Sequence, residues 1–163
     1  MNLYRAAALT GALALAFGAA ADDAIVLAER SGIRIEDGVV VATGPRAPAG
    51  AVFLTIVNEG GDDTLLGVAS DAAARAELHD TEVADGIARM RPVASVPIPA
   101  DATVVLAGGG LHVMLMGLTA PLTDGGAVPL TLRFEHAGTI PLEVPVMLKR
   151  PATGAGAMPG MSH

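Results

Sequence analysis

The sequence predicts an all-β domain built as an antiparallel sandwich. Many short runs of β-forming residues alternate with Gly, Pro, Asn and Asp, which is the pattern of a sandwich with frequent turns. No stretch has the 3.6-residue periodicity of a long helix, and no internal repeat is visible. The chain of 163 residues is long enough for one domain with a substantial core.

The first expected strands are rich in branched residues. Residues 33–36 and 39–41 consist largely of Ile and Val and precede a Gly/Pro-containing loop at 43–50. Residues 51–58 are mostly β-formers and stop at the turn-forming residues 59–62. Branched and aromatic side chains bounded by turn residues indicate strands in all three ranges.

Three further strands are expected in the middle of the chain. Residues 64–68 and 76–81 are short β-rich runs, and 86–92 follows a turn at residues 84–85. Each run is bounded by small or polar residues, so we expect strands of ordinary length.

The last expected strands surround a run of three glycines. Residues 103–106 lead into the glycines at 108–110, and 111–118 follows directly. Residues 128–135 and 139–147 complete the predicted sandwich.

The N-terminal segment, residues 1–21, is interpreted as a secretory signal peptide. Arg5 supplies a positive charge, residues 6–20 are apolar, and small residues precede Asp22. The apolar stretch is short for a membrane span, so we expect no stable membrane insertion after cleavage; a retained N-terminal anchor is the alternative. A lipid anchor of the bacterial type requires a cysteine, and the chain has none.

The remaining chain is divided into three expected parts. Residues 22–32 form a lead, and residues 33–148 form the β-sandwich domain. Residues 149–163 are rich in Gly, Ala and Pro and are expected to form a disordered tail.

Composition excludes several classes of function. A formal net charge of −7 argues against nucleic-acid binding. Beyond the signal segment, Phe53 and Phe134 are the only aromatic residues, so stacking sites for bases or sugars are not expected. No nucleophile–base pair, carboxylate dyad or phosphate loop is visible, and we expect no enzymatic activity.

The strongest chemical signal is a set of two imidazoles and two thioethers. His79 is followed after ten residues by Met90, then after twenty-one by His112, and after one more by Met114. Thioethers are soft donors that select Cu(I), and imidazole also suits copper. The set carries no anionic donor, which favours Cu(I) over Cu(II).

Strand alternation predicts that these side chains share one face. In 111–118, Leu111, Val113 and Leu115 would face the core, whereas His112, Met114 and Met116 would face outward. Leu78 would similarly point inward and His79 outward. The alternative, in which the methionines are core fillers, loses to the metal hypothesis because two histidines fall at matched positions.

Other histidines and methionines have simpler interpretations. His136 is interpreted as an ordinary turn histidine, and Met147 is expected to pack in the last strand or at its end. Met158, Met161 and His163 in the tail could form a second, weaker metal site that also engages Cu(II). The alternative is a solvated tail with incidental residues.

At these residues the chain resembles the PCuAC family of periplasmic copper chaperones. The family's H-x10-M-x21-H-x-M motif matches His79, Met90, His112 and Met114, and similarity covers about residues 33–148. The resemblance implies a cupredoxin-like Greek-key β-sandwich or barrel, a periplasmic location and Cu(I) binding. It also implies copper delivery to the binuclear centre of the cytochrome c oxidase copper domain, or to another copper chaperone, by a protein expected to be a monomer.

Three alternative functions differ in how they would use these residues. Copper storage or detoxification without a specific acceptor would use the same ligands. An electron-transfer cupredoxin would require a cysteine thiolate, which is missing from the sequence. A metal-free interaction sandwich predicts no copper binding at all.

Overall fold

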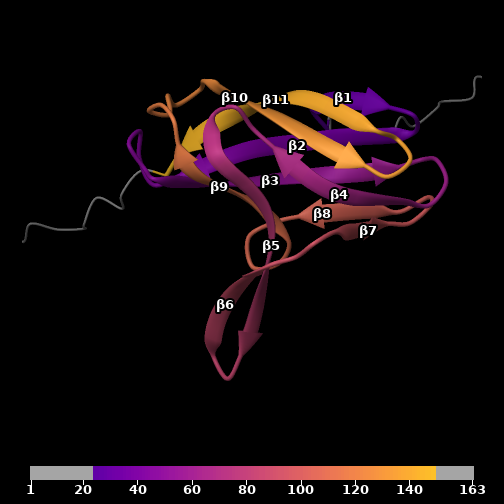
Figure 1. The fold of residues 1–163 in the computed structure, drawn as a ribbon, viewed down its shortest axis with the longest axis horizontal. Helices are drawn as coiled ribbons and strands as arrows, with labels where there is room; N and C mark the ends of the chain where they lie inside the picture. The colour runs from indigo at the N-terminus through magenta and orange to yellow at the C-terminus, as the bar shows by residue number, and fades with distance from the viewer. Residues whose placement is uncertain (1–23, 150–163) are drawn as a thin grey trace, which may run out of the picture.

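The computed structural model describes residues 24–149, and this part of the chain is entirely β-structure with loops (Figure 1). Within this range, no helix is long and apolar enough to cross a membrane. The strands are β1 (Val26–Arg30), β2 (Ile33–Ala42), β3 (Ala49–Asn58), β4 (Asp63–Ala69), β5 (Ala73–Ala84), β6 (Ile87–Pro92), β7 (Val96–Ile98), β8 (Thr103–Leu106), β9 (His112–Leu118), β10 (Ala127–Phe134) and β11 (Thr139–Leu148).

The strands form one continuous path of hydrogen-bonded neighbours that folds over into two layers. The order is β6-β5-β9-β3-β2-β11-β10-β4-β7, with β1 paired to β2 and β8 paired to β3. The pairing of β11 with β2 is parallel, and all the other pairings are antiparallel. The predicted all-β sandwich class is confirmed, with this one parallel pair as the departure from a fully antiparallel arrangement.

The core lies between the two layers and is built from alternating side chains. In β10 and β11 every second residue is buried, as the period of two requires. Ile35, Leu54 and Leu115 from one layer and Leu132 and Val144 from the other are among the fully or almost fully buried residues. This packing fixes which face of β3, β5 and β9 is turned away from the core.

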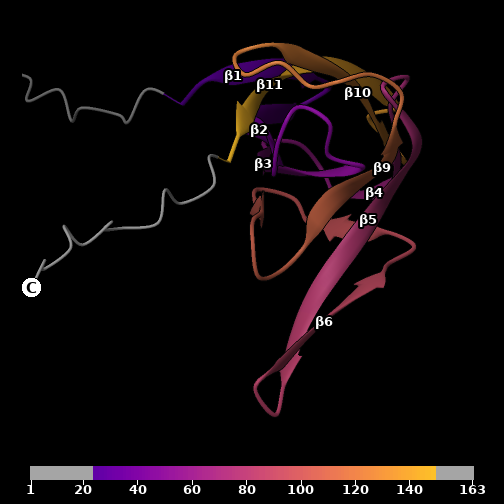
Figure 2. The ribbon, with the colours of Figure 1, turned by 90° about the vertical axis from the view of Figure 1, so that its left-hand side faces the viewer.

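The β5–β6 hairpin extends beyond the rest of the domain. Both views show it projecting from the body, with β6 as the outermost strand (Figures 1 and 2). Every residue of β6 is exposed. The hairpin remains attached through the part of β5 that pairs with β9.

Three details differ from the expected strands. The two runs at 33–36 and 39–41 form a single strand, β2, because a bulge between Glu36 and Val39 continues the pairing with β3. β1 lies within the expected lead, and β7 occupies a short segment for which no strand was expected. β7 contains Pro97 and ends the path of strands, which is the position where proline is tolerated in a sheet.

Candidate metal centre

Strand register brings the four motif residues to one face of the β6-β5-β9 part of the sheet. His79 on β5 lies directly opposite His112 on β9, and Met114 is two residues further along β9. Met90 on β6 lies opposite Thr81, which is two residues beyond His79 on β5. Because side chains two apart share a face, all four motif side chains lie on the face opposite the core.

This face is more covered than the alternation predicted. His112 is only 4% exposed, and the side chain of His79 is 14% exposed. Phe53 of β3 lies edge-on to the His112 ring, with centroids 6.3 Å apart. His112 lies on the face opposite the core, as the alternation predicts, but a neighbouring strand and the 108–110 loop enclose it there.

A hollow of about 220 Å³ is lined by three of the four motif side chains, whereas His79 lies next to His112 and does not line it. It is lined by Ala51, Phe53, Thr81, Met90, Gly108, Gly109, His112 and Met114. Met90 is 61% exposed and forms its open side. The small side chains of the alanine and glycines leave space where imidazole and thioether groups can meet one ion.

The two histidine rings are close and tilted toward each other. Their centroids are 6.1 Å apart, with an angle of 53° between the ring planes. Metal–imidazole bonds are about 2 Å long, so this separation allows one ion to bond both rings where a nitrogen of each ring faces it. Among residues 24–149, Nδ1 of His79 is buried and has no hydrogen-bond partner.

Hydrogen bonds fix one nitrogen of each ring. Nε2 of His79 lies 3.1 Å from Oε2 of Glu77. Nδ1 of His112 lies 2.9 Å from the carbonyl oxygen of Gly110. Metal-binding histidines commonly use their second nitrogen in this way to hold the ring in place.

Glu77 and Arg75 extend this network along β5, and the sequence analysis did not identify them. Arg75 forms an ion pair with Oε1 of Glu77, while His79 contacts the other carboxylate oxygen. Arg75, and then His79, hold the pKa of Glu77 below its ordinary value. The signal was present in the alternation, because residues 75, 77 and 79 share a face.

The donor set fits a soft monovalent ion better than a hard divalent one. No group of three or more His, Cys, Asp or Glu side chains within the described range could hold a metal ion. The thioethers of Met90 and Met114 line the same hollow as the ring of His112. Soft thioether ligands select Cu(I), and two neutral imidazoles complete a compatible set.

The other candidate residues lie apart from the hollow. Met116 shares the face of Met114 but pairs with Arg75 and Ala49, one pleat further along. Met147 was expected to pack, but it is 59% exposed because it lies on the outward face of β11. Met158, Met161 and His163 are outside the described residues.

His136 lies in the turn between β10 and β11. Its backbone N–H donates to Oδ1 of Asp63 at 2.9 Å, and its side chain is 69% exposed. Its Nδ1 also lies 3.5 Å from Oδ1 of the buried Asp63, and the interpretation as an ordinary turn histidine stays a prediction.

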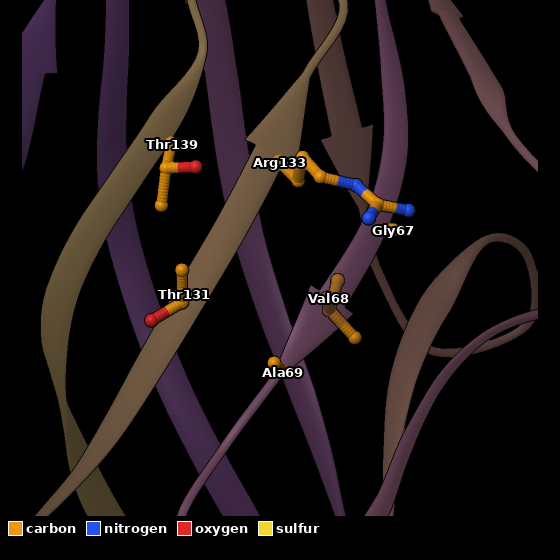
Figure 3. A pocket seen from close by; sticks show the side chains of 6 residues that line it. All are labelled: Gly67, Val68, Ala69, Thr131, Arg133 and Thr139. Atoms are coloured by element: carbon orange, nitrogen blue, oxygen red, sulfur yellow. The ribbon is translucent and has the colours of Figure 1, made fainter.

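A second hollow of about 180 Å³ lies on the other layer. Figure 3 shows Arg133 of β10 reaching toward Gly67 of β4, with Thr131 and Thr139 beside it. A Cβ on Gly67 would lie 3.5 Å from the Arg133 guanidinium. One cation and two hydroxyl groups in a shallow hollow do not form a metal site.

Solved structures with a similar fold include PCuAC domains. The copper-bound PCuAC domain from PmoF2 has a TM-score of 0.63 and 24% sequence identity, covering 74% of this chain and 97% of that domain. Apo-DR1885 from Deinococcus radiodurans has a TM-score of 0.54 and 30% identity, covering 91% of this chain and 95% of that one. Its Cu(I) form, CuI-DR1885, has a TM-score of 0.53 and 31% identity, covering 80% and 83%. The described domain is therefore of the cupredoxin-like class that PCuAC domains represent.

The sequence comparisons identify the family within this class. The family model described as "Putative lipoprotein LpqE-like" matches residues 33–146, and the chain belongs to this family. A protein named "Putative lipoprotein Lxx21020", from Leifsonia xyli subsp. xyli (strain CTCB07), is 38% identical over 120 residues. That match covers 72% of this chain and 71% of the relative.

Proposed function

We propose that this protein is an extracytoplasmic copper chaperone that binds one Cu(I) ion through His79, Met90, His112 and Met114. The observation that carries this proposal is that Met90, His112 and Met114 line one hollow while His79 lies opposite His112 on the same face of the sheet, with a buried Nδ1 that has no hydrogen-bond partner among residues 24–149. The similarity to structures described as a copper-bound PCuAC domain and as CuI-DR1885 supports copper as the cargo.

The chemistry of the donors suits a carrier. Two imidazoles and two thioethers bind Cu(I) without adding charge, and each can be exchanged singly for a donor of another protein. Met90 is exposed at the open side of the hollow, so exchange can begin there. A periplasmic location is part of the proposal, and the relatives described as lipoproteins support a place outside the cytoplasm.

The proposed acceptor is the binuclear copper centre of cytochrome c oxidase. Anaerobic titration with Cu(I) in the presence of a competing chelator should give one tight equivalent per chain. Mixing the loaded protein with an apo oxidase copper domain should then move the ion to that domain. Absence of tight Cu(I) binding would refute the chaperone, whereas binding without transfer would indicate storage or a different acceptor.

A second metal site in the tail is also proposed. Met158, Met161 and His163 combine thioethers for Cu(I) with an imidazole that can engage Cu(II). Lys149, the last described residue, lines a hollow of about 270 Å³ that Met114 also lines. Tethering to the domain would raise the effective concentration of copper captured by these residues.

A further inference from the structure

The two histidines of the site are held by different ring nitrogens. His79 contacts Glu77 through Nε2, at 3.1 Å, whereas His112 contacts the Gly110 carbonyl through Nδ1, at 2.9 Å. A carboxylate and a carbonyl oxygen can only accept hydrogen bonds. The nitrogen that faces each acceptor must therefore carry the proton, and in a neutral ring the other nitrogen carries the lone pair.

The remaining nitrogens have the properties of metal donors. Nδ1 of His79 is buried and has no hydrogen-bond partner in the described chain. Buried polar atoms in proteins are nearly always paired, so an unpaired one indicates a missing water or ion. The ring of His112 lines the hollow itself, and its Nδ1 is already used by Gly110.

Glu77 is placed to orient His79 without binding copper. It lies directly opposite Met114 across the β5–β9 pair, so its carboxylate is near the hollow. Its two oxygens are nevertheless engaged, one by Arg75 and one by His79. Cu(I) prefers nitrogen and sulfur to carboxylate oxygen, so Glu77 acts through the imidazole.

We infer that His79 and His112 bind Cu(I) through opposite ring nitrogens, Nδ1 of His79 and Nε2 of His112, with Glu77 as the positioning residue that fixes His79. This inference rests on the proposed Cu(I) function, and it specifies the atoms that the motif alone does not. Removal of an outer partner of a metal-binding histidine commonly weakens metal binding about 10–100-fold.

Long-range ¹H–¹⁵N correlation spectra of the imidazoles test the assignment in the full chain. In the metal-free protein, His79 should carry its proton on Nε2 and His112 on Nδ1. One equivalent of Cu(I), added anaerobically, should shift the ¹⁵N resonances of Nδ1 of His79 and Nε2 of His112. The imidazole resonances of His136 should stay unchanged. These spectra identify which ring nitrogen is bonded to the ion. A change that affected only folding would not alter that assignment.

Variants at Glu77 test its positioning role. Glu77→Ala should release the fixed tautomer of His79 and weaken Cu(I) binding tenfold or more. Glu77→Gln keeps an acceptor oxygen and should weaken it less. Glu82→Ala is the matched control on the same strand, because Glu82 pairs with Arg91 instead, and it should leave the tautomer and the affinity unchanged.

The outcomes separate this inference from the proposed function. Cu(I)-induced shifts at Nε2 of His79, or wild-type tautomer and affinity in Glu77→Ala, would overturn the inference while leaving Cu(I) binding intact. No shift at either His79 or His112 would refute the copper site itself, and the inference with it.

Discussion

The buried Nδ1 of His79 is the atom whose environment most needs an explanation. A buried nitrogen without a hydrogen-bond partner costs about 1–3 kcal/mol, and this one lies beside a second histidine and a thioether-lined hollow. An ion bonded to the nitrogen would remove that cost.

Truncation of single donors tests the site. His112→Ala and Met114→Leu should each weaken Cu(I) binding tenfold or more, which corresponds to about 1.4 kcal/mol. Each variant removes one bond to the ion while the strand that carries it stays paired on both sides. Chelator competition under anaerobic conditions measures the change.

Met116→Leu is the matched control for Met114→Leu. Met116 is on the same face of β9 but does not line the hollow, so its variant should retain nearly the wild-type Cu(I) affinity. Equal losses at the two positions would mean that the wrong methionine was assigned to the ion. Wild-type affinity in His112→Ala would remove that histidine from the site.

Sequence reasoning predicted which residues share a face but not how covered that face is. The period of two places His112 and Met114 together regardless of the rest of the fold. Coverage depends on contacts from elsewhere in the chain, here Phe53 and the glycine loop. Alternation also places Glu77 on the face of His79, but the contact between them depends on side-chain conformations that alternation does not supply.

At the scale of elements, Gly117 controls how closely β9 and β5 approach. It has a φ of 65°, and a Cβ there would lie 2.9 Å from the Cβ of Ala74. Backbone strain of this kind costs about 1–3 kcal/mol. Gly117→Ala adds the close contact with Ala74 to that strain, so we expect its destabilisation to lie at the top of this range or above it. Urea unfolding measures it.

Gly86→Ala at the tip of the β5–β6 hairpin separates the two effects. Gly86 has a φ of 73°, but nothing lies within 4 Å of its added Cβ. It should therefore show the cost of backbone strain without the contact. Equal destabilisation by both variants would show that the contact with Ala74 contributes nothing.

Asp63 ties the start of β4 to the turn between β10 and β11. Burial would raise its pKa, but hydrogen bonds from the backbone N–H groups of His136, Ala137 and Thr64 lower it below the ordinary value. A lowered folded-state pKa contributes stability above the unfolded value, about 3.9, which is lost as pH falls through the folded-state pKa. Asp63→Asn should cost about 1–3 kcal/mol at neutral pH.

The destabilisation caused by Asp63→Asn should itself depend on pH. The stability difference between the wild type and Asp63→Asn should shrink as the pH falls below about 4. Urea unfolding at pH 7 and pH 3 measures both proteins. A difference that stays constant across this range would contradict the hydrogen-bonded carboxylate as its cause.

The elements that the sequence did not predict are those with weak patterns. β1 has no clean alternation and is largely exposed or half-buried, so its pairing with β2 is what makes it a strand. β7 has three residues with a proline between two buried positions. The longer strands carried enough β-formers to be predicted within a few residues of their bounds.

For the whole molecule, the tail is the part that can add a second function to the domain. A chain ending at Arg150 should lose Cu(II) binding and keep the Cu(I) site. Metal titration of the two chains with each oxidation state measures the stoichiometry; an unchanged value for both states would show that the tail residues are incidental.

The projecting hairpin bears on how fast the proposed copper ion can be exchanged, rather than on how tightly it is bound. Three of the proposed donors belong to strands embedded in the sheet, whereas Met90 belongs to its outermost strand and is largely in solvent. An incoming donor from another protein can reach an ion on that side without any strand of the body separating. Exchange of the proposed ion would then begin at the thioether of Met90, while the three donors on β5 and β9 still hold it.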